Sequence, residues 1–300
     1  MYVCCLDLGG TNIRGTWIGN SGARGVLTSF TRPPSLEGTK QVLVSIIRRI
    51  GQDAPEDISG IGLASAGPLD YLNNRYLATT NTPELDYFQV GDFLQAEFNL
   101  PVLMENDAQA AAMGEVWQGS LAGSSSAVVL TLGTGVGSGV ILNDHIWRGD
   151  HLTGPELGHV FMGENRKLCG CGQYGCAETW LNNEALLELF KEHGCIPDGL
   201  REMVLSLQNG DDKAWDAIEI YGKRLGFYIS ILQVVFGIEN IGVSGGLSAF
   251  VPYCSPYIWQ ELKERLQKRR LWVPERIVAS ADPEMSALYG MARAWMLKRE

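Results

Sequence analysis

Short apolar runs separated by glycine open the chain. One extends from Tyr2 to Leu8 and ends in Gly9-Gly10, and a second extends from Ile13 to Ile18. Apolar runs of this length, bounded by turn residues, are typical of β-strands joined in a hairpin. The pattern therefore predicts two opening strands whose connecting turn carries an acid and a hydroxyl.

Helix and strand patterns then alternate up to residue 118. Apolar residues recur every three or four positions between 42 and 50, which predicts a helix, and the apolar run 58–63 predicts a strand leading into Ser65-Ala66-Gly67-Pro68. A further short run, 101–104, precedes Glu105-Asn106-Asp107 and an alanine-rich segment. This order predicts a strand followed by a helix, with Asp107 at or near the helix N-cap.

The second half of the chain repeats the opening pattern. Residues 123–126 are interpreted as a linker, and the strands expected at 127–132 and 139–142 are interrupted by Gly133-Thr134-Gly135-Val136-Gly137. Beyond them the pattern predicts helices at about 182–193 and 211–236, a strand at 240–243 and a closing helix from about residue 283. Two elements of strand, glycine turn and strand indicate a duplicated α/β fold with a cleft between its halves.

Length and composition narrow the class of protein. The 300 residues are 45% hydrophobic and 19% charged, which is typical of a folded chain, and this length favours two lobes. The net charge of −10 and the lack of a basic run longer than Lys268-Arg269-Arg270 disfavour nucleic-acid binding. No apolar run reaches the ~20 residues of a membrane span, and no signal peptide is evident, so we expect a cytoplasmic protein.

A cluster of cysteines is the strongest chemical signal. Three of the seven cysteines lie in Cys169-Gly-Cys171-Gly-Gln-Tyr-Gly-Cys176, and His159 lies shortly before them. Glycines between cysteines indicate a loop, although three buried thiols without a metal are the alternative. Three thiolates and one imidazole suit tetrahedral zinc, and four protein ligands leave no open position. We therefore predict a structural zinc site of His159, Cys169, Cys171 and Cys176.

Glycine-rich turns are candidate phosphate sites, because they let backbone N–H groups approach an anion closely. The sequence Asp7-Leu-Gly-Gly-Thr-Asn12 is explained on its own by a tight hairpin. Four glycines at alternate positions from Gly133 to Gly139 weaken a strand and favour phosphate contact, with a flexible bulge as the alternative. Ser244-Gly245-Gly246 is a third candidate. Neither a Walker A loop nor a Rossmann fingerprint is present.

Taken in order, these segments resemble the ROK family (repressors, open reading frames and sugar kinases) over nearly the whole chain. Asp7 to Thr11 is similar to the family's first phosphate motif, Gly60 to Asp70 to its connecting motif, and Gly133 to Gly139 to its second phosphate motif. Glu156-Leu-Gly-His159 together with Cys169 to Glu178 resembles its combined sugar and zinc signatures.

The resemblance implies a fold and a role for each residue. The fold would be the α/β two-lobed actin-like ATPase (ribonuclease H-like) architecture, with residues 1–118 and a helix at about 283–300 in one lobe, and 119–282 in the other. Asp107 would be the catalytic base, and relatives imply a homodimer. The sugar would be held by Gly67, Asn106, Asp107, Glu156, His159 and Glu178. ATP with Mg²⁺ would be held by Asp7, Gly9, Gly10, Thr11, Asn12, Gly133, Thr134, Gly135, Gly137, Gly245 and Gly246.

The predicted activity is phosphoryl transfer from ATP to a hexose. Asp107 would accept the proton of the attacking hydroxyl, with the 6-hydroxyl of glucose preferred, and one ring nitrogen of His159 would bind zinc while the other faces the sugar. N-acetylmannosamine, N-acetylglucosamine, fructose and allose stay open as substrates, and polyphosphate as donor. A sugar-sensing regulator is the alternative of another class. A family repressor would need a winged-helix domain, for which the turn at Asp7 is expected to leave no room.

The chain departs from the family pattern at two positions. Ala66 stands where many members have proline, and Ser244 replaces the first glycine of the adenosine-side motif. The first bears on sugar selectivity and the second on nucleotide preference.

Overall fold

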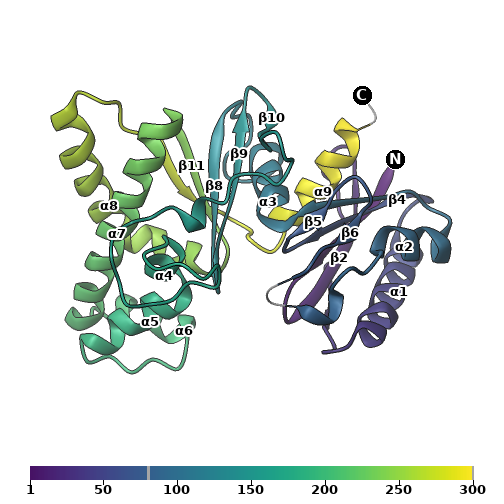
Figure 1. The fold of residues 1–300 in the computed structure, drawn as a ribbon, viewed down its shortest axis with the longest axis horizontal. Helices are drawn as coiled ribbons and strands as arrows, with labels where there is room; N and C mark the ends of the chain where they lie inside the picture. The colour runs from purple at the N-terminus through teal and green to yellow at the C-terminus, as the bar shows by residue number, and fades with distance from the viewer. Residues whose placement is uncertain (80–81, 299–300) are drawn as a thin grey trace. The chain divides into compact units, whose positions relative to one another are not determined.

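The computed structural model describes residues 1–79 and 82–298. Within them the chain forms two units, each built on a five-stranded sheet (Figure 1). Unit 1 comprises Met1–Gly123, Ile146–Gly154 and the chain from Glu284, and unit 2 comprises Ser124–His145 and Pro155–Pro283. The last two residues of the closing helix expected at about 283–300 lie outside the described residues.

The two sheets share one strand order. In unit 1 the order is β3-β2-β1-β4-β7, and in unit 2 it is β10-β9-β8-β11-β12. The second strand of each hairpin runs antiparallel to the first, whereas β1, β4 and β7, like β8, β11 and β12, run parallel. The bounds are β1 (Tyr2–Leu8), β2 (Asn12–Gly19), β3 (Thr28–Thr31), β4 (Ile58–Ser65), β7 (Val102–Asn106), β8 (Ala127–Leu132), β9 (Val136–Leu142), β10 (His145–Ile146), β11 (Asn240–Ser244) and β12 (Arg276–Ala279). The duplicated α/β fold predicted from the sequence is confirmed.

Both faces of β1 are buried, since successive side chains of the strand point alternately into two separate cores. Cys4, Leu6 and Leu8 of β1 belong to the core that includes the apolar positions of α1 (Leu36–Asp53). Val3 and Cys5 belong to a second core with α9 (Ser286–Leu297). Helix α1 confirms the helix predicted from the apolar spacing at 42–50 but begins earlier, where the Ser35 side chain caps it by accepting a hydrogen bond from the N–H of Gly38. A strand covered on both faces explains the nearly continuous apolar run at the start of the chain.

Helices α3 (Asp107–Trp117) and α9 pack unusually closely within unit 1. A Cβ atom at Gly290 would lie 1.7 Å from the carbonyl oxygen of Ala110, and one at Gly114 would lie 1.9 Å from that of Ser286. Only glycine therefore fits at these two crossings. The closing helix in this way fixes the position of the helix that starts at Asp107.

Helices dominate the rest of unit 2, where α7 and α8 lie side by side (Figure 1). The predicted helices at 182–193 and 211–236 are confirmed as α5 and α7, whereas α6 and α8 of this unit and α2 of unit 1 were not predicted. Pro256 lies inside α8, and a proline there hides the helical pattern. The bounds are α2 (Val90–Phe98), α4 (Glu178–Leu181), α5 (Asn183–Glu192), α6 (Leu200–Gln208), α7 (Asp212–Phe236) and α8 (Val251–Leu266). Short elements are β5 (Leu69–Asp70), β6 (Arg75–Tyr76) and the 3-10 helices η1 (Pro83–Leu85), η2 (Leu157–His159), η3 (Gly246–Phe250) and η4 (Gln267–Arg269).

The glycine turn of unit 2 is shorter than predicted. Strand β9 begins at Val136, opposite Leu132, so the connection is Gly133 to Gly135 and not Gly133 to Gly137. Gly137 and Gly139 lie in the ladder, opposite Thr131 and Val129. Backbone pairing needs no side chain, so the two glycines do not interrupt the hairpin. Because alternate residues fall on one face of a strand, they place no side chain on that face.

Among the described residues, no helix has both the length and the apolar character that a bilayer span requires.

Candidate active site

The predicted site residues of unit 1 meet at one edge of its sheet. Leu8, Ser65 and Asn106 are the last residues of β1, β4 and β7, and they lie next to one another in the parallel register. The turn Gly9 to Asn12, the residue Gly67 and the residue Asp107 each follow one of these strand ends. The carboxyl ends of parallel strands are the usual ligand-binding edge of an α/β sheet.

Asn106 and Asp107 are held at the start of α3. Asn106 is the N-cap, and its Oδ1 accepts hydrogen bonds from the N–H groups of Ala108 (3.0 Å) and Gln109 (3.1 Å). Asp107 is the first helical residue, and its Oδ1 accepts from the N–H of Ala108 at 2.8 Å. The Asn106 Nδ2 atom lies 4.0 Å from where a Cβ of Gly67 would be. A carboxylate at this end of a helix is stabilised by the helix dipole.

An ion pair between the buried Glu105 and the half-buried Arg148 lies next to this helix start. Glu105 is 3% exposed; its Oε1 accepts from the N–H of Asn106 at 3.0 Å, and its other oxygen pairs with Arg148. Gln109 Nε2 donates to the carbonyl oxygen of Thr153 at 3.0 Å. Segment 146–154 therefore packs against the first turn of α3. Sequence reasoning missed both contacts, and no local pattern around Arg148 indicates its partner.

The turn between β1 and β2 closes on itself. The N–H of Gly9 donates to the carbonyl oxygen of Asn12 at 2.9 Å. Asp7, one residue before the end of β1, accepts from Arg14 at 2.8 Å, and Arg14 also contacts Glu284 at 3.1 Å. Burial raises the pKa of Asp7, and the charge and hydrogen bond of Arg14 offset only part of that rise. Residues 10–12 at the tip of the turn are exposed.

The glycine turns of unit 2 also lie at one sheet edge. Gly133 follows β8 and Gly245 follows β11, and the ends of these strands pair in parallel register. Gly245 has a φ of 82°, and a Cβ there would lie 2.4 Å from the carbonyl oxygen of Leu132, so the position requires glycine. The carbonyl oxygen of Gly133 accepts from the N–H of Asn183 at 2.8 Å, which fixes the turn at the start of α5.

The four predicted metal ligands come together in unit 2. Their donor atoms lie within 4.8 Å of one another. Cys171 Sγ and Cys176 Sγ are 3.6 Å apart, and Cys169 Sγ is 3.5 Å from His159 Nδ1. Ligands at tetrahedral corners around zinc stand ~3.8 Å apart for two sulfurs and ~3.6 Å for sulfur and nitrogen, given metal bonds of ~2.3 and ~2.1 Å. These two spacings are close to the tetrahedral values, and the four residues are a group that could hold a metal ion.

Tight turns present these thiols. The N–H of Gly172 donates to the carbonyl oxygen of Cys169 at 2.9 Å, with Gly172 at a φ of 85°. Burial raises the pKa of Cys169 to about 12 and also raises that of Cys176, whereas the N–H of Gln173 lowers the pKa of Cys171. Metals bind the thiolate form, so a cation here would displace protons from the two buried thiols.

Glu178 links the cysteine cluster to the glycine hairpin. One of its oxygens accepts from Cys169 Sγ at 3.2 Å, and the other accepts from the N–H of Val136 at 3.1 Å. His159 directs Nδ1 toward the cysteines, and its Nε2 lies 3.9 Å from Glu156 Oε2. The three side chains predicted to hold sugar in this unit thus lie around one loop, and the two ring nitrogens of His159 face different partners.

A cavity of about 170 Å³ lies beside this loop and adds residues that the sequence did not indicate. Lys167 and Asn182 line it together with Glu178. Asn182 also caps α5, accepting from the N–H of Ala185 at 2.9 Å. An asparagine just before a helical pattern is a detectable N-cap signal, whereas nothing in the sequence marks Lys167.

Relatives of this chain include kinases and a repressor. The glucokinase of Streptomyces coelicolor is 30% identical over 207 residues, which cover 68% of this chain and 64% of that protein. The N-acetyl-D-glucosamine kinase of Photobacterium profundum is 27% identical over 304 residues, covering 95% and 96%. The xylose repressor of Bacillus spizizenii is 34% identical over 157 residues, covering 51% and 40%. The match to the first of these thus spans less than two thirds of the relative's length.

Solved structures share the fold over the full chain. The ROK hexokinase of Thermus thermophilus has a TM-score of 0.84 at 27% identity, and the comparison covers 100% of both chains. A ROK family glucokinase of Streptomyces griseus, solved with glucose and AMPPNP, has a TM-score of 0.82 at 25% identity, covering 98% and 99%. These likenesses confirm the predicted two-lobed actin-like ATPase fold. The ROK family model matches residues 3–299, and the chain belongs to the ROK family.

Proposed function

We propose that this chain transfers the γ-phosphate of ATP to a hexose, with the 6-hydroxyl of glucose as the first candidate acceptor. The observation that carries the proposal is the shared sheet edge of unit 1. There Asp107, the first residue of α3, comes directly after β7. The glycine turn Gly9 to Asn12 comes directly after β1, which is parallel to β7 and separated from it by β4. A base and a phosphate-binding turn at one edge are the parts that phosphoryl transfer needs.

Each residue of unit 1 then has a task. Asp107 accepts the proton of the attacking hydroxyl, while Asn106 and Gly67 hold the sugar beside it. Gly9, Gly10, Thr11 and Asn12 hold phosphate oxygens through backbone and side-chain donors. Mg²⁺, bound with ATP, supplies positive charge that neutralises the phosphates, and Asp7 would hold it through water. Alignment of the two reactants provides much of the rate gain.

Residues of unit 2 have proposed tasks as well. Gly133, Thr134, Gly135 and Gly137 with Gly245 and Gly246 hold the nucleotide, Gly137 from a position inside the strand ladder. Glu156, His159 and Glu178 hold sugar hydroxyls. His159, Cys169, Cys171 and Cys176 would bind a structural zinc ion, whose chemistry is to fix the loop and the orientation of the His159 ring.

A panel of sugars with ATP and Mg²⁺ tests this proposal. Glucose, N-acetylmannosamine, N-acetylglucosamine, fructose and allose should be compared, with polyphosphate as a second donor. Asp107→Asn should lower kcat ~10²–10⁴-fold and leave sugar binding nearly intact, because the amide keeps its shape but cannot take the proton. Asp212→Asn is the matched control, because Asp212 is the first residue of α7 as Asp107 is of α3. Near wild-type kcat in Asp107→Asn at saturating sugar would reject Asp107 as the base.

The second candidate is a sugar-sensing regulator without kinase activity, which the match to a xylose repressor favours. It predicts sugar binding without turnover of any sugar in the panel. The homodimer and the cytoplasmic location stay predictions, to be tested by light scattering and by fractionation of cells.

A further inference from the structure

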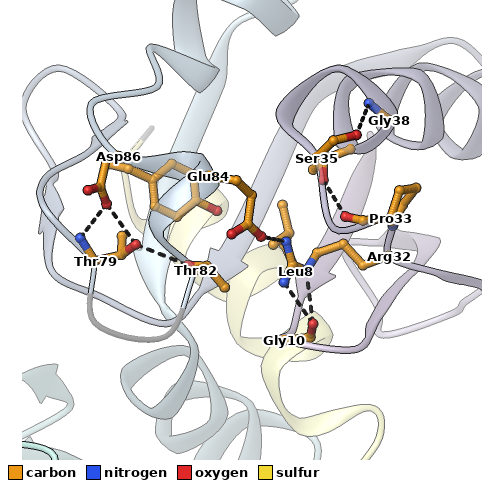
Figure 2. Close-up of polar contacts among 12 residues, drawn as sticks. Leu8, Gly10, Arg32, Pro33, Ser35, Gly38, Thr79, Thr82, Glu84 and Asp86 are labelled. Atoms are coloured by element: carbon orange, nitrogen blue, oxygen red, sulfur yellow. Dashed lines mark hydrogen bonds and ion pairs between the residues drawn. The ribbon is translucent and has the colours of Figure 1, made fainter.

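Arg32 makes hydrogen bonds to the proposed phosphate turn of unit 1, Gly9 to Asn12 (Figure 2). It follows β3, and its backbone N–H donates to the carbonyl oxygen of Thr11 at 2.7 Å. Its guanidinium donates twice to the carbonyl oxygen of Gly10, from Nε at 3.0 Å and from Nη2 at 2.8 Å. The side chain is only 7% exposed. A buried guanidinium that grips a carbonyl of the turn at two points limits how that turn can move.

Glu84 holds the other end of the same guanidinium. Its carboxylate pairs with Arg32 Nη1, and its side chain is 21% exposed. Burial alone would raise the pKa of Glu84, but the hydrogen bond and charge of Arg32 outweigh burial and hold that pKa below its ordinary value. With three of its donor atoms engaged, Arg32 is occupied within the protein.

The segment that carries Glu84 is itself anchored. Asp86 accepts from the N–H of Thr79 at 2.7 Å and from its hydroxyl at 2.9 Å, and Thr82 donates to that hydroxyl at 3.3 Å (Figure 2). Leu85, next to Glu84, is fully buried in the unit 1 core. Glu84 is therefore a fixed support for Arg32 rather than a mobile surface acid.

A second connection reaches the near end of the turn. The Tyr76 hydroxyl donates to Ser65 Oγ at 2.8 Å, and Ser65 donates to the carbonyl oxygen of Leu8 at 3.1 Å. Tyr76 and Ser65 are both buried, and burial raises the pKa of the Tyr76 phenol, which keeps its proton for this bond. The neutral chain Tyr76–Ser65–Leu8 holds the residue before the turn, and the charged pair Arg32–Glu84 holds its tip.

We propose that Arg32 is a positioning residue for the phosphate turn, fixed by Glu84, and that it sets the affinity for the phosphates of ATP. The inference rests on the proposed function and deepens it. Arg32 acts through the carbonyl of Gly10, and its guanidinium does not bind phosphate itself. With the turn held in one conformation, its N–H groups need no reordering when the nucleotide binds, which favours binding.

Arg32→Lys is the discriminating change, because an ammonium keeps the charge but cannot grip Gly10 and Glu84 together as the planar fork does. We expect KM for ATP to rise about 10-fold, the scale of losing a charge-assisted hydrogen bond. KM for the sugar should change less than about 2-fold. Glu84→Gln should act in the same direction but more weakly, and the double variant should be little worse than Arg32→Lys. Arg48→Lys is the matched control, because Arg48 pairs with Glu97 at 2.5 Å between α1 and α2.

Two further measurements do not depend on turnover. Hydrogen exchange of residues 9–12 should quicken in Arg32→Lys and stay unchanged in Arg48→Lys, and calorimetry should show about 10-fold weaker AMPPNP binding in Arg32→Lys. Unchanged exchange and unchanged AMPPNP affinity, or equal weakening of sugar and nucleotide, would overturn the inference. If the wild-type chain phosphorylates no sugar, the proposed function fails, while the exchange and AMPPNP measurements still decide the role of Arg32.

Discussion

The crossing of α3 and α9 allows a sharp test of how the fold holds Asp107, the proposed base, in place. In Gly290→Ala the new Cβ would lie 1.7 Å from the carbonyl oxygen of Ala110, whereas ordinary contacts begin at 3.4 Å, so the two backbones must separate. Overpacking of this kind typically costs ~1–3 kcal/mol or more, against ~1 kcal/mol gained from the helix propensity of alanine. Gly51→Ala in α1, where a Cβ meets nothing within 4 Å, keeps only that gain. Because the propensity gain is common to both variants, their free energies of unfolding should differ by the overpacking cost alone, ~1–3 kcal/mol or more.

Urea denaturation of both variants measures this difference, and a kinase assay shows its effect on the site. Because α3 begins at Asp107, a displaced α3 moves the proposed base, and a shift of about 1 Å can cost ~10²-fold in rate. Gly290→Ala should thus lose both stability and kcat, whereas Gly51→Ala should gain stability and keep kcat. Equal stability of the two variants would refute the argument that the helix backbones touch at this crossing.

Three further outcomes are expected. The purified protein should carry about one zinc ion per chain, and Cys171→Ser should lose it; elemental analysis of both proteins decides this, and zinc retained by the variant would exclude the proposed ligand set. Removing zinc with a chelator should raise KM for the sugar ~10–100-fold and barely change KM for ATP, because the ring of His159 loses its orientation. Circular dichroism must show that the fold survives, and equal weakening of both substrates would count against the coupling. In the folded chain the pKa of Glu84 lies below its ordinary value of 4.5. The stabilisation from the Arg32–Glu84 pair is therefore fully present above pH 4.5 and is lost as the pH falls through the lowered pKa. Urea titrations between about pH 6 and pH 3 should show a steeper loss of stability in the wild type than in Glu84→Gln, and parallel curves would contradict the pairing.

The sequence predicted those helices, strands and loops whose apolar spacing or glycine content is visible within a short segment. The opening hairpin, the strand before Asn106, and the long helix 212–236 follow from runs and spacings of apolar residues, and the cysteine loop follows from its glycines. Pro256 lies inside helix α8 and hides its pattern, and the predicted glycine turn is longer than the observed one because a strand ladder tolerates glycine. Patterns of apolar and turn residues report backbone periodicity, and such exceptions depend on tertiary contacts.

The ion pairs beside the candidate site could not be predicted from the sequence for another reason. Arg32 and Glu84 are 52 residues apart in the sequence, and Glu105 and Arg148 are 43 residues apart. A short segment of sequence therefore contains only one member of each pair. The family resemblance named the residues proposed to touch substrates. It did not name the residues that hold them, since those contacts are visible only once the strands and turns are placed.

The place of α9 in the chain has a consequence for how the protein is made. Leu288 and Met291 cover the same core as Val3 and Cys5, yet about 160 residues, all but nine of them in unit 2, separate the two parts of unit 1. At ~5–20 residues per second, a ribosome needs ~10–30 s to cross that interval. Released chains truncated before Glu284 should therefore show a protease-resistant unit 2 beside a protease-sensitive unit 1. During synthesis β1 precedes α9 by this interval, and one apolar face of β1 is open to chaperones until α9 has been made.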